Sequence, residues 1–332
     1  MLKKITRPMV LAIATATAAA AGSVASANDY ILNTASTGGT YHPVGTAIAT
    51  LSKIKLLPKE KFSLTAVNSA GSGANVQALA ADTAQFAILQ GLYGSYAATG
   101  TGPVSEKQEN LRSITMLWQN VEQFILANDH VNSGTVSDFA AIKGEPVVMG
   151  KENSGTLGSN TVLMEGLDLG LDNYTQVHAG YGPSADAMAN GQAAGGGFPA
   201  GPPTGAITKL MSSNGDKFTI LNVTAEEHEK MDGGRNLWVP YTIEAGTYPG
   251  QDAAVETIAQ PNFLAVNADV DEQHVYLLTK TIYENLPFLQ AIHKATNAMD
   301  VSKAMGGLPV PLHPGAAKYY KEIGLEIPEN LM

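Results

Sequence analysis

Two glycine-rich breaks early in the chain carry residues suited to binding an anion. Residues 37–45 read Thr-Gly-Gly-Thr-Tyr-His-Pro-Val-Gly, and residues 68–73 read Asn-Ser-Ala-Gly-Ser-Gly. Each break follows an apolar run and precedes a segment with helical spacing, and Thr40 is the expected N-cap of the first helix. The start of a helix offers free backbone N–H groups and the positive end of the helix dipole. We therefore expect a carboxylate group to bind at these breaks.

Two further polar loops occur in the second half of the chain. Residues 150–156 read Gly-Lys-Glu-Asn-Ser-Gly-Thr, and residues 180–184 read Gly-Tyr-Gly-Pro-Ser. For one loop alone, turn geometry explains the glycines. Several loops rich in Ser, Thr, Asn and Gln favour binding in a shared cleft. The candidate ligand-binding residues are Thr37, Gly38, Gly39, Tyr41, Ser72, Gln90, Ser154, Gly155, Thr156, Tyr181 and Phe198.

Arginine is scarce, since Arg112 and Arg235 are the only arginines after residue 27. A bidentate arginine clamp, which fixes carboxylates in many binding proteins, is therefore nearly excluded. We expect neutral donors to hold the carboxylate, each hydrogen bond to a charged group contributing about 1.5–3 kcal/mol. Arg112 is expected to be a structural ion-pair partner at the start of a strand.

Apolar runs, polar loops and helical segments alternate in order along both halves. This alternation predicts parallel sheets whose loops meet at the carboxyl edge, where ligands bind. Residues 112–127 form a long extended passage suited to a crossing between two units. Residues 257–266 are also extended, but Pro261 limits them to an edge strand or a crossing segment. The expected strands of the two units are 30–32, 62–67 and 86–89, then 146–149, 175–178 and 193–198.

The first 27 residues have the composition of a signal peptide. Lys3, Lys4 and Arg7 precede an apolar stretch too short to span a bilayer, and Ala-Ser-Ala at residues 25–27 is a small-residue cleavage site. We expect cleavage near Ala27 and a soluble periplasmic product. Removing three positive charges and no negative charge changes the net charge from −10 to −13. That balance disfavours binding to nucleic acid.

Motifs for catalysis, cofactors and metals are missing from the sequence. There is no cysteine, the seven histidines are scattered, and no Gly-x-Ser-x-Gly, phosphate-loop or complete Gly-x-Gly-x-x-Gly pattern occurs. The leading alternative from another class of protein is an enzyme. We expect no catalytic residue, no metal, no cofactor and no enzymatic activity.

With these loops in view, the sequence resembles the TAXI family, the TRAP-associated extracytoplasmic solute-binding proteins. The family's Thr-Gly-Gly-Thr-Tyr-x-Pro-x-Gly and Gly-x-x-x-Ser-Gly-Thr patterns match residues 37–45 and 150–156. Where the family usually has Asp-Ala followed by bulky apolar residues, residues 193–198 read Ala-Ala-Gly-Gly-Gly-Phe. The other matches are Gly71-Ser72 with Asn75, Ala81-Asp82-Thr83-Ala84 with a strand ending at Gln90, Tyr-Pro-Gly-Gln-Asp at 248–252 and His-Pro-Gly-Ala-Ala-Lys-Tyr-Tyr at 313–320.

The resemblance implies an α/β, two-lobed periplasmic binding protein fold of type II, with the ligand cleft between parallel-rich lobes. Lobe I would comprise residues 28–120 plus 250–332, and lobe II residues 121–249. The implied function is capture of glutamate, glutamine or a C4–C5 dicarboxylate such as 2-oxoglutarate by a monomer that delivers it to a TRAP membrane permease. The alternative is a ligand sensor that docks on a membrane sensor kinase.

Overall fold

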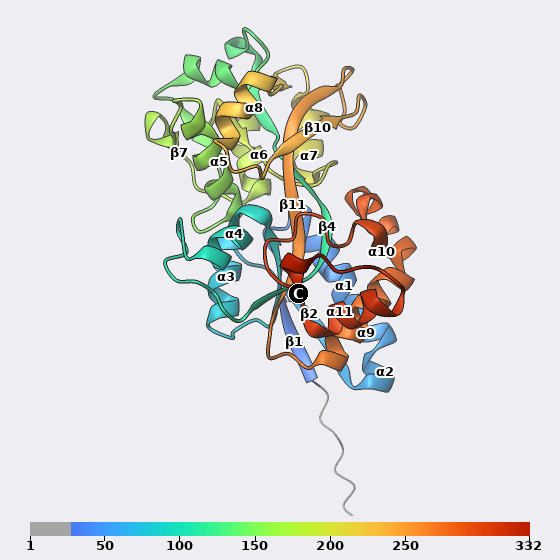
Figure 1. Cartoon of the computed structure of the whole chain (residues 1–332). Coiled ribbons are helices and arrows are strands. Elements are labelled where there is room, and N and C mark those ends of the chain that lie inside the picture. The colour runs from blue at the N-terminus through green and yellow to red at the C-terminus, as the bar shows by residue number, and fades with distance from the viewer. Residues whose placement is uncertain (1–27) are drawn as a thin grey trace, which may run out of the picture.

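The protein consists of two α/β lobes joined by two long strands (Figure 1). The computed structural model describes residues 28–332, so the expected signal peptide lies outside the described residues. We call the part built on the six-stranded sheet lobe I and the part built on the five-stranded sheet lobe II. This architecture confirms the predicted fold class. The residue boundaries expected for the two lobes stay a prediction.

Lobe I contains three parallel strands that alternate with helices, as predicted. β1 pairs in parallel with both β2 and β3, and β11 and β4 complete the sheet in antiparallel orientation. The strands are β1 (Asn28–Asn33), β2 (Phe62–Val67), β3 (Phe86–Gln90), β4 (Leu111–Val121) and β11 (Val255–Asn267). The helices are α1 (Tyr41–Lys55), α2 (Leu57–Glu60), α3 (Ser72–Ala80), α4 (Gly91–Thr99), α9 (Glu272–Glu284), α10 (Leu286–Ile292) and α11 (Pro314–Glu322).

Lobe II has its sheet in the order β7-β6-β8-β5-β9, and β6 is parallel to both of its neighbours. The strands are β5 (Phe124–Ala127), β6 (Pro146–Val148), β7 (Thr175–Gln176), β8 (Gly195–Gly197) and β9 (Phe218–Ile220). The sixth strand of the six-stranded sheet, β10 (Val239–Ile243), pairs with the start of β11 and lies beside lobe II (Figure 1). The helices are α5 (Gly155–Gly166), α6 (Tyr181–Ala189), α7 (Gly205–Asn214) and α8 (Ala225–Asp232). The glycines of β8 leave room for Asn160 of α5, since a Cβ on Gly197 would lie 2.4 Å from its amide oxygen.

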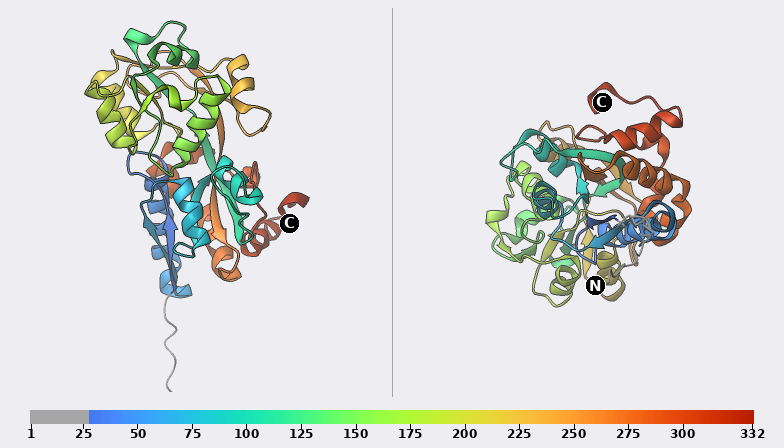
Figure 2. Two further views of the ribbon diagram at one scale, coloured as in Figure 1. Left: turned by 90° about the vertical axis from the view of Figure 1, so that its left-hand side faces the viewer. Right: turned by 90° about the horizontal axis from the view of Figure 1, so that it is seen from below.

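The antiparallel strands β4 and β11 run from one lobe into the other and form the hinge (Figures 1 and 2). β11 contacts β10 through Val255–Ala259 and β3 through Asn262–Val266, and Pro261 lies between these two stretches. Pro261 therefore occupies a place where no neighbour on that side needs its missing N–H group. The expected crossing segment is confirmed, but the expectation of an edge strand is wrong, because β11 has partners on both sides.

Glu122, at the point where β4 leads into β5, is a buried carboxylic acid in the hinge. Its Oε1 accepts hydrogen bonds from the indole of Trp238 (2.8 Å) and the amide of Gln260 (3.3 Å), and its Oε2 has no partner within residues 28–332. Burial raises the pKa of Glu122 to about 7, and the two hydrogen bonds offset this only in part. The folded protein therefore holds this proton to a higher pH than the unfolded chain does.

The buried acid Glu122 is expected to make the wild-type protein less stable to unfolding at neutral than at acid pH, and Glu122→Gln is expected to reduce this difference. The wild-type acid favours the folded state below its ordinary pKa of 4.5, and this contribution is lost as the pH rises to about 7. The glutamine is neutral throughout, so its melting temperature should exceed that of the wild type by about 2–4 °C at pH 8 and by less at pH 5. Calorimetric melting at both pH values checks this, and an equal difference at both would contradict it.

Candidate functional site

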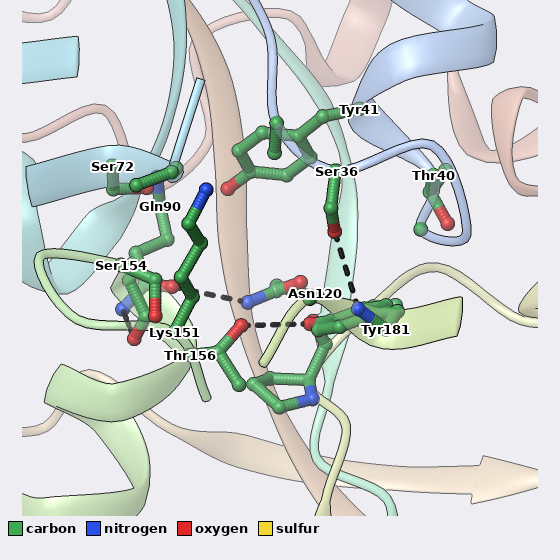
Figure 3. Close-up of a pocket in the computed structure, with 18 of the residues that line it drawn as sticks. Ser36, Thr40, Tyr41, Ser72, Gln90, Asn120, Lys151, Ser154, Thr156 and Tyr181 are labelled. Atoms are coloured by element: carbon green, nitrogen blue, oxygen red, sulfur yellow. Dashed lines mark hydrogen bonds between the residues drawn. The ribbon is translucent and has the colours of Figure 1, made fainter. Parts of the chain in front are cut away.

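A cavity of about 40 Å³ lies between the lobes, on the hinge side of the cleft (Figure 3). A water molecule needs about 10–15 Å³ of such space, so the cavity suits a compact solute and excludes a nucleotide or an oligosaccharide. The polar residues that line it are Ser36, Thr40, Tyr41, Ser72, Gln90, Asn120, Lys151, Ser154, Thr156 and Tyr181. Ala35, Gly39, Ala70, Gly71, Gly155, Ala179, Gly180, Pro199 and Ala200 complete the wall.

Four helices, two from each lobe, begin in the wall of this cavity. The first residues of α1, α3 and α6 line it, and so do the first two residues of α5. Each helix follows a strand, which is why the polar breaks of the sequence meet here. The four positive dipole ends favour an anion in the space between them.

The caps of two of these helices differ in chemistry. Ser154 caps α5 as expected, because its Oγ accepts the N–H of Leu157 at 3.0 Å. Thr40 precedes α1 but its hydroxyl does not cap the helix. It donates instead to the carbonyl of Gly201, 2.8 Å away in lobe II. Thr40 is therefore the N-cap residue, as predicted, but its hydroxyl joins the two lobes instead of capping the helix.

Lys151 is the one charged residue among those that line the cavity in the described part of the chain. Figure 3 shows its side chain extended across the cavity toward Tyr41 and Ser72. None of the ion pairs found within residues 28–332 includes Lys151. The structure therefore places one cationic side chain beside the neutral donors that we expected to hold the carboxylate.

Neither described arginine lines the cavity, in agreement with the absence of an arginine clamp. Arg112 lies at the start of β4 and donates to the carbonyls of Glu109 (2.9 Å) and Leu111 (2.8 Å). The ion-pair role expected for Arg112 is therefore wrong.

Hydrogen bonds across the cleft hold the lobes together around the cavity. Gln90 of lobe I donates through Nε2 to the carbonyl of Gly155 (3.0 Å), and Tyr93 donates to that of Ser154 (3.3 Å). On the other side, the N–H of Tyr181 donates to Ser36 at 3.4 Å. The structure is thus the closed form of a two-lobed protein.

Tyr41 and Tyr181 contribute buried hydroxyl groups from opposite lobes. Tyr41 donates to Asn262 of β11, and Tyr181 donates to the carbonyl of Pro199 while it accepts from Thr156 at 2.9 Å. Burial raises the pKa of both tyrosines well above the usual value, so both rings stay neutral. Neutral hydroxyls add no negative charge to a wall that favours anions.

The structure brings eight of the eleven candidate residues to the cavity and places Thr37, Gly38 and Phe198 elsewhere. Thr37 is exposed at the tip of its loop. Gly38 accepts the N–H of Ala206 and so belongs to the contact between the lobes. Phe198 is 1% exposed and packs edge-on against Tyr181, in the core of lobe II. The eight at the cavity are Gly39, Tyr41, Ser72, Gln90, Ser154, Gly155, Thr156 and Tyr181.

Four polar lining residues are not among the eleven candidates: Ser36, Thr40, Asn120 and Lys151. Lys151 belongs to the polar loop 150–156, and Ser36 directly precedes the glycine-rich break at residues 37–45. Their positions in or beside predicted binding loops could therefore have identified both residues. Asn120 lies near the end of a buried hinge strand, where neither spacing nor composition marks it.

A family model described as NMT1-like family matches residues 32–324. The chain belongs to the NMT1-like family. Within residues 28–332 of this NMT1-like protein, no helix is long and apolar enough to cross a membrane, and no group of three or more acidic or histidine side chains is placed to hold a metal ion.

Solved structures of similar fold include three with TM-scores above 0.5. MatC from Rhodopseudomonas palustris with bound malate is 14% identical, with a TM-score of 0.54, over 82% of this chain and 90% of MatC. The periplasmic binding protein BugD is 15% identical, with a TM-score of 0.53, over 90% of this chain and 94% of BugD. A protein from Bordetella bronchiseptica RB50 is 14% identical, with a TM-score of 0.53, over 91% and 90% of the two chains.

These similarities show that the NMT1-like chain has the fold of periplasmic binding proteins. The predicted fold is therefore confirmed by comparison as well as by topology.

Proposed function

We propose that this NMT1-like protein binds a small organic acid between its lobes and delivers it to a TRAP-type membrane permease, as TAXI proteins do. The observation that carries the proposal is the convergence of Lys151 and four helix N-termini on a cavity in which residues 28–332 place no acidic residue. An ammonium group and several dipole ends attract a carboxylate without an arginine.

The ligand range proposed is glutamate, glutamine or a C4–C5 dicarboxylate such as 2-oxoglutarate. The small cavity supports a compact acid. MatC, which shares the fold, was solved with malate, so malate belongs in the same range.

Binding is proposed to couple to closure of the lobes, with residues 28–120 and 250–332 in one and 121–249 in the other. A ligand held by Ser72 on one side and by Lys151 on the other favours the closed form through its contacts with both lobes. The closed form would then be the form that the permease recognises.

A thermal-shift panel tests the proposal. L-Glutamate, L-glutamine, succinate, L-malate and 2-oxoglutarate are compared with uncharged succinamide and with inorganic phosphate. At least one acid should raise the melting temperature by several degrees at saturating concentration, and succinamide should not, because only a native-state ligand stabilises. Stabilisation by succinamide alone, or by none of the acids, would contradict the proposal. Uptake into liposomes holding the permease subunits should then require this protein.

A further inference from the structure

Asn120 is a buried amide in the cavity wall. The residue lies near the end of β4 and is 1% exposed. Its Nδ2 donates to Oε1 of Gln90 at 3.4 Å, and its Oδ1 has no partner in the part of the chain that the structure describes. Figure 3 shows the amide at the cavity, with the oxygen turned away from Gln90 and toward Ser36.

The orientation of this amide follows from its neighbours. Gln90 Nε2 donates to the carbonyl of Gly155, which can only accept, so Gln90 presents Oε1 to Asn120. Only the NH₂ group of Asn120 can satisfy that oxygen. The amide oxygen of Asn120 is therefore the atom left for a ligand.

We infer that Asn120 makes the cavity selective for acids that carry a hydroxyl or amino hydrogen-bond donor near the carboxylate. This inference rests on the proposed function. In the open protein, water reaches the amide oxygen. When the lobes close over a ligand that has no hydrogen-bond donor, the amide oxygen of Asn120 is buried without a partner. A hydroxyl or ammonium group on the ligand instead donates a hydrogen bond to it. Unsubstituted acids and 2-oxo acids lack that donor.

The preference is expected to be about 5- to 100-fold, the usual consequence of leaving one buried polar group unpaired. Calorimetric titration of the mature protein with two matched pairs measures it: L-malate against succinate, and L-glutamate against glutarate. The substituted acid of at least one pair should bind more tightly by that factor. Affinities within threefold in both pairs would overturn the inference and leave the proposed function standing. Binding of none of the four would overturn both.

Asn120→Leu removes both polar atoms at similar size and is expected to reduce the ratio within the responding pair to threefold or less. Asn120→Asp keeps an acceptor, so it should bind both acids more weakly and preserve the ratio. A purely structural role would weaken both members of a pair equally and leave the ratio unchanged in Asn120→Leu, which would overturn the assignment. If the leucine variant does not fold, Asn120→Ala serves for the same comparison.

Gln119→Leu is the matched control for these variants. Gln119 is the preceding residue of the same strand, its side chain points to the opposite face, and it does not line the cavity. The ratio should stay at the wild-type value in this variant. A fall in the ratio equal to that of Asn120→Leu would show that the hinge strand, rather than the amide oxygen, sets the preference, and would overturn the inference.

Discussion

Gly73→Ala is expected to weaken ligand binding by about 10- to 100-fold without altering the cavity wall. Gly73 is the second residue of α3 in lobe I, and a Cβ there would lie 2.6 Å from the backbone carbonyl oxygen of Asn153 in lobe II. The same carbonyl accepts the N–H of Ala74 at 2.9 Å, so the backbones of the two lobes touch at this point. Relieving such an overlap costs about 1–3 kcal/mol of free energy. The overlap exists only when the lobes are in contact, so this cost destabilises the closed form alone.

Gly182→Ala is the matched control for this prediction. Gly182 is the second residue of α6, also beside the cleft, and a Cβ there meets no atom within 4 Å. Titration calorimetry with the best acid of the panel should show near wild-type affinity for Gly182→Ala. Melting of the unliganded proteins should show that Gly73→Ala remains folded. Equal affinities for the two variants would mean that closure at Asn153 is not needed for binding.

Lys151→Met is expected to weaken binding of the same acid by about 10- to 100-fold, because it removes the one charged group that residues 28–332 contribute to the cavity wall. A hydrogen bond to a charged group contributes about 1.5–3 kcal/mol, and each 1.4 kcal/mol is tenfold in affinity. Lys151→Arg keeps the charge and should retain most of the affinity. The measurement is titration calorimetry at low and high salt, since salt should weaken the wild type more than the methionine variant.

Lys143→Met controls for the change in net charge. Lys143 is exposed in the same lobe and does not line the cavity. Its removal should leave the affinity unchanged at both salt concentrations. Wild-type affinity in Lys151→Met would contradict the role of the ammonium group in holding the acid.

The strand and helix order of both lobes could be predicted because it depends on local signals. β2 begins and ends at the predicted residues, and α1 begins directly after Thr40. The parallel alternation also predicted which loops would meet, because the carboxyl ends of parallel strands lie at one edge of a sheet. That reasoning led to eight of the residues now found at the cavity.

The roles of single side chains could not be predicted in the same way. The hydroxyl of Thr40 has the right position for a cap but bonds to Gly201, which is 161 residues away in the chain. Phe198 follows a glycine strand and turns into the core, since β8 pairs with β5 on one side and β6 on the other. Both outcomes depend on partners distant in sequence.

The sequence by itself determined that this chain folds as alternating strands and helices with polar breaks at their junctions, because periodicity and glycine placement act over a few residues. Only the tertiary structure decided which side chains face the ligand space. Lys151 reaches the cavity because Gly150, at φ +120°, turns the loop, and Asn120 reaches it because the hinge strand passes behind the cleft. Such directions are set by the packing of two lobes against each other, and no local pattern encodes that packing.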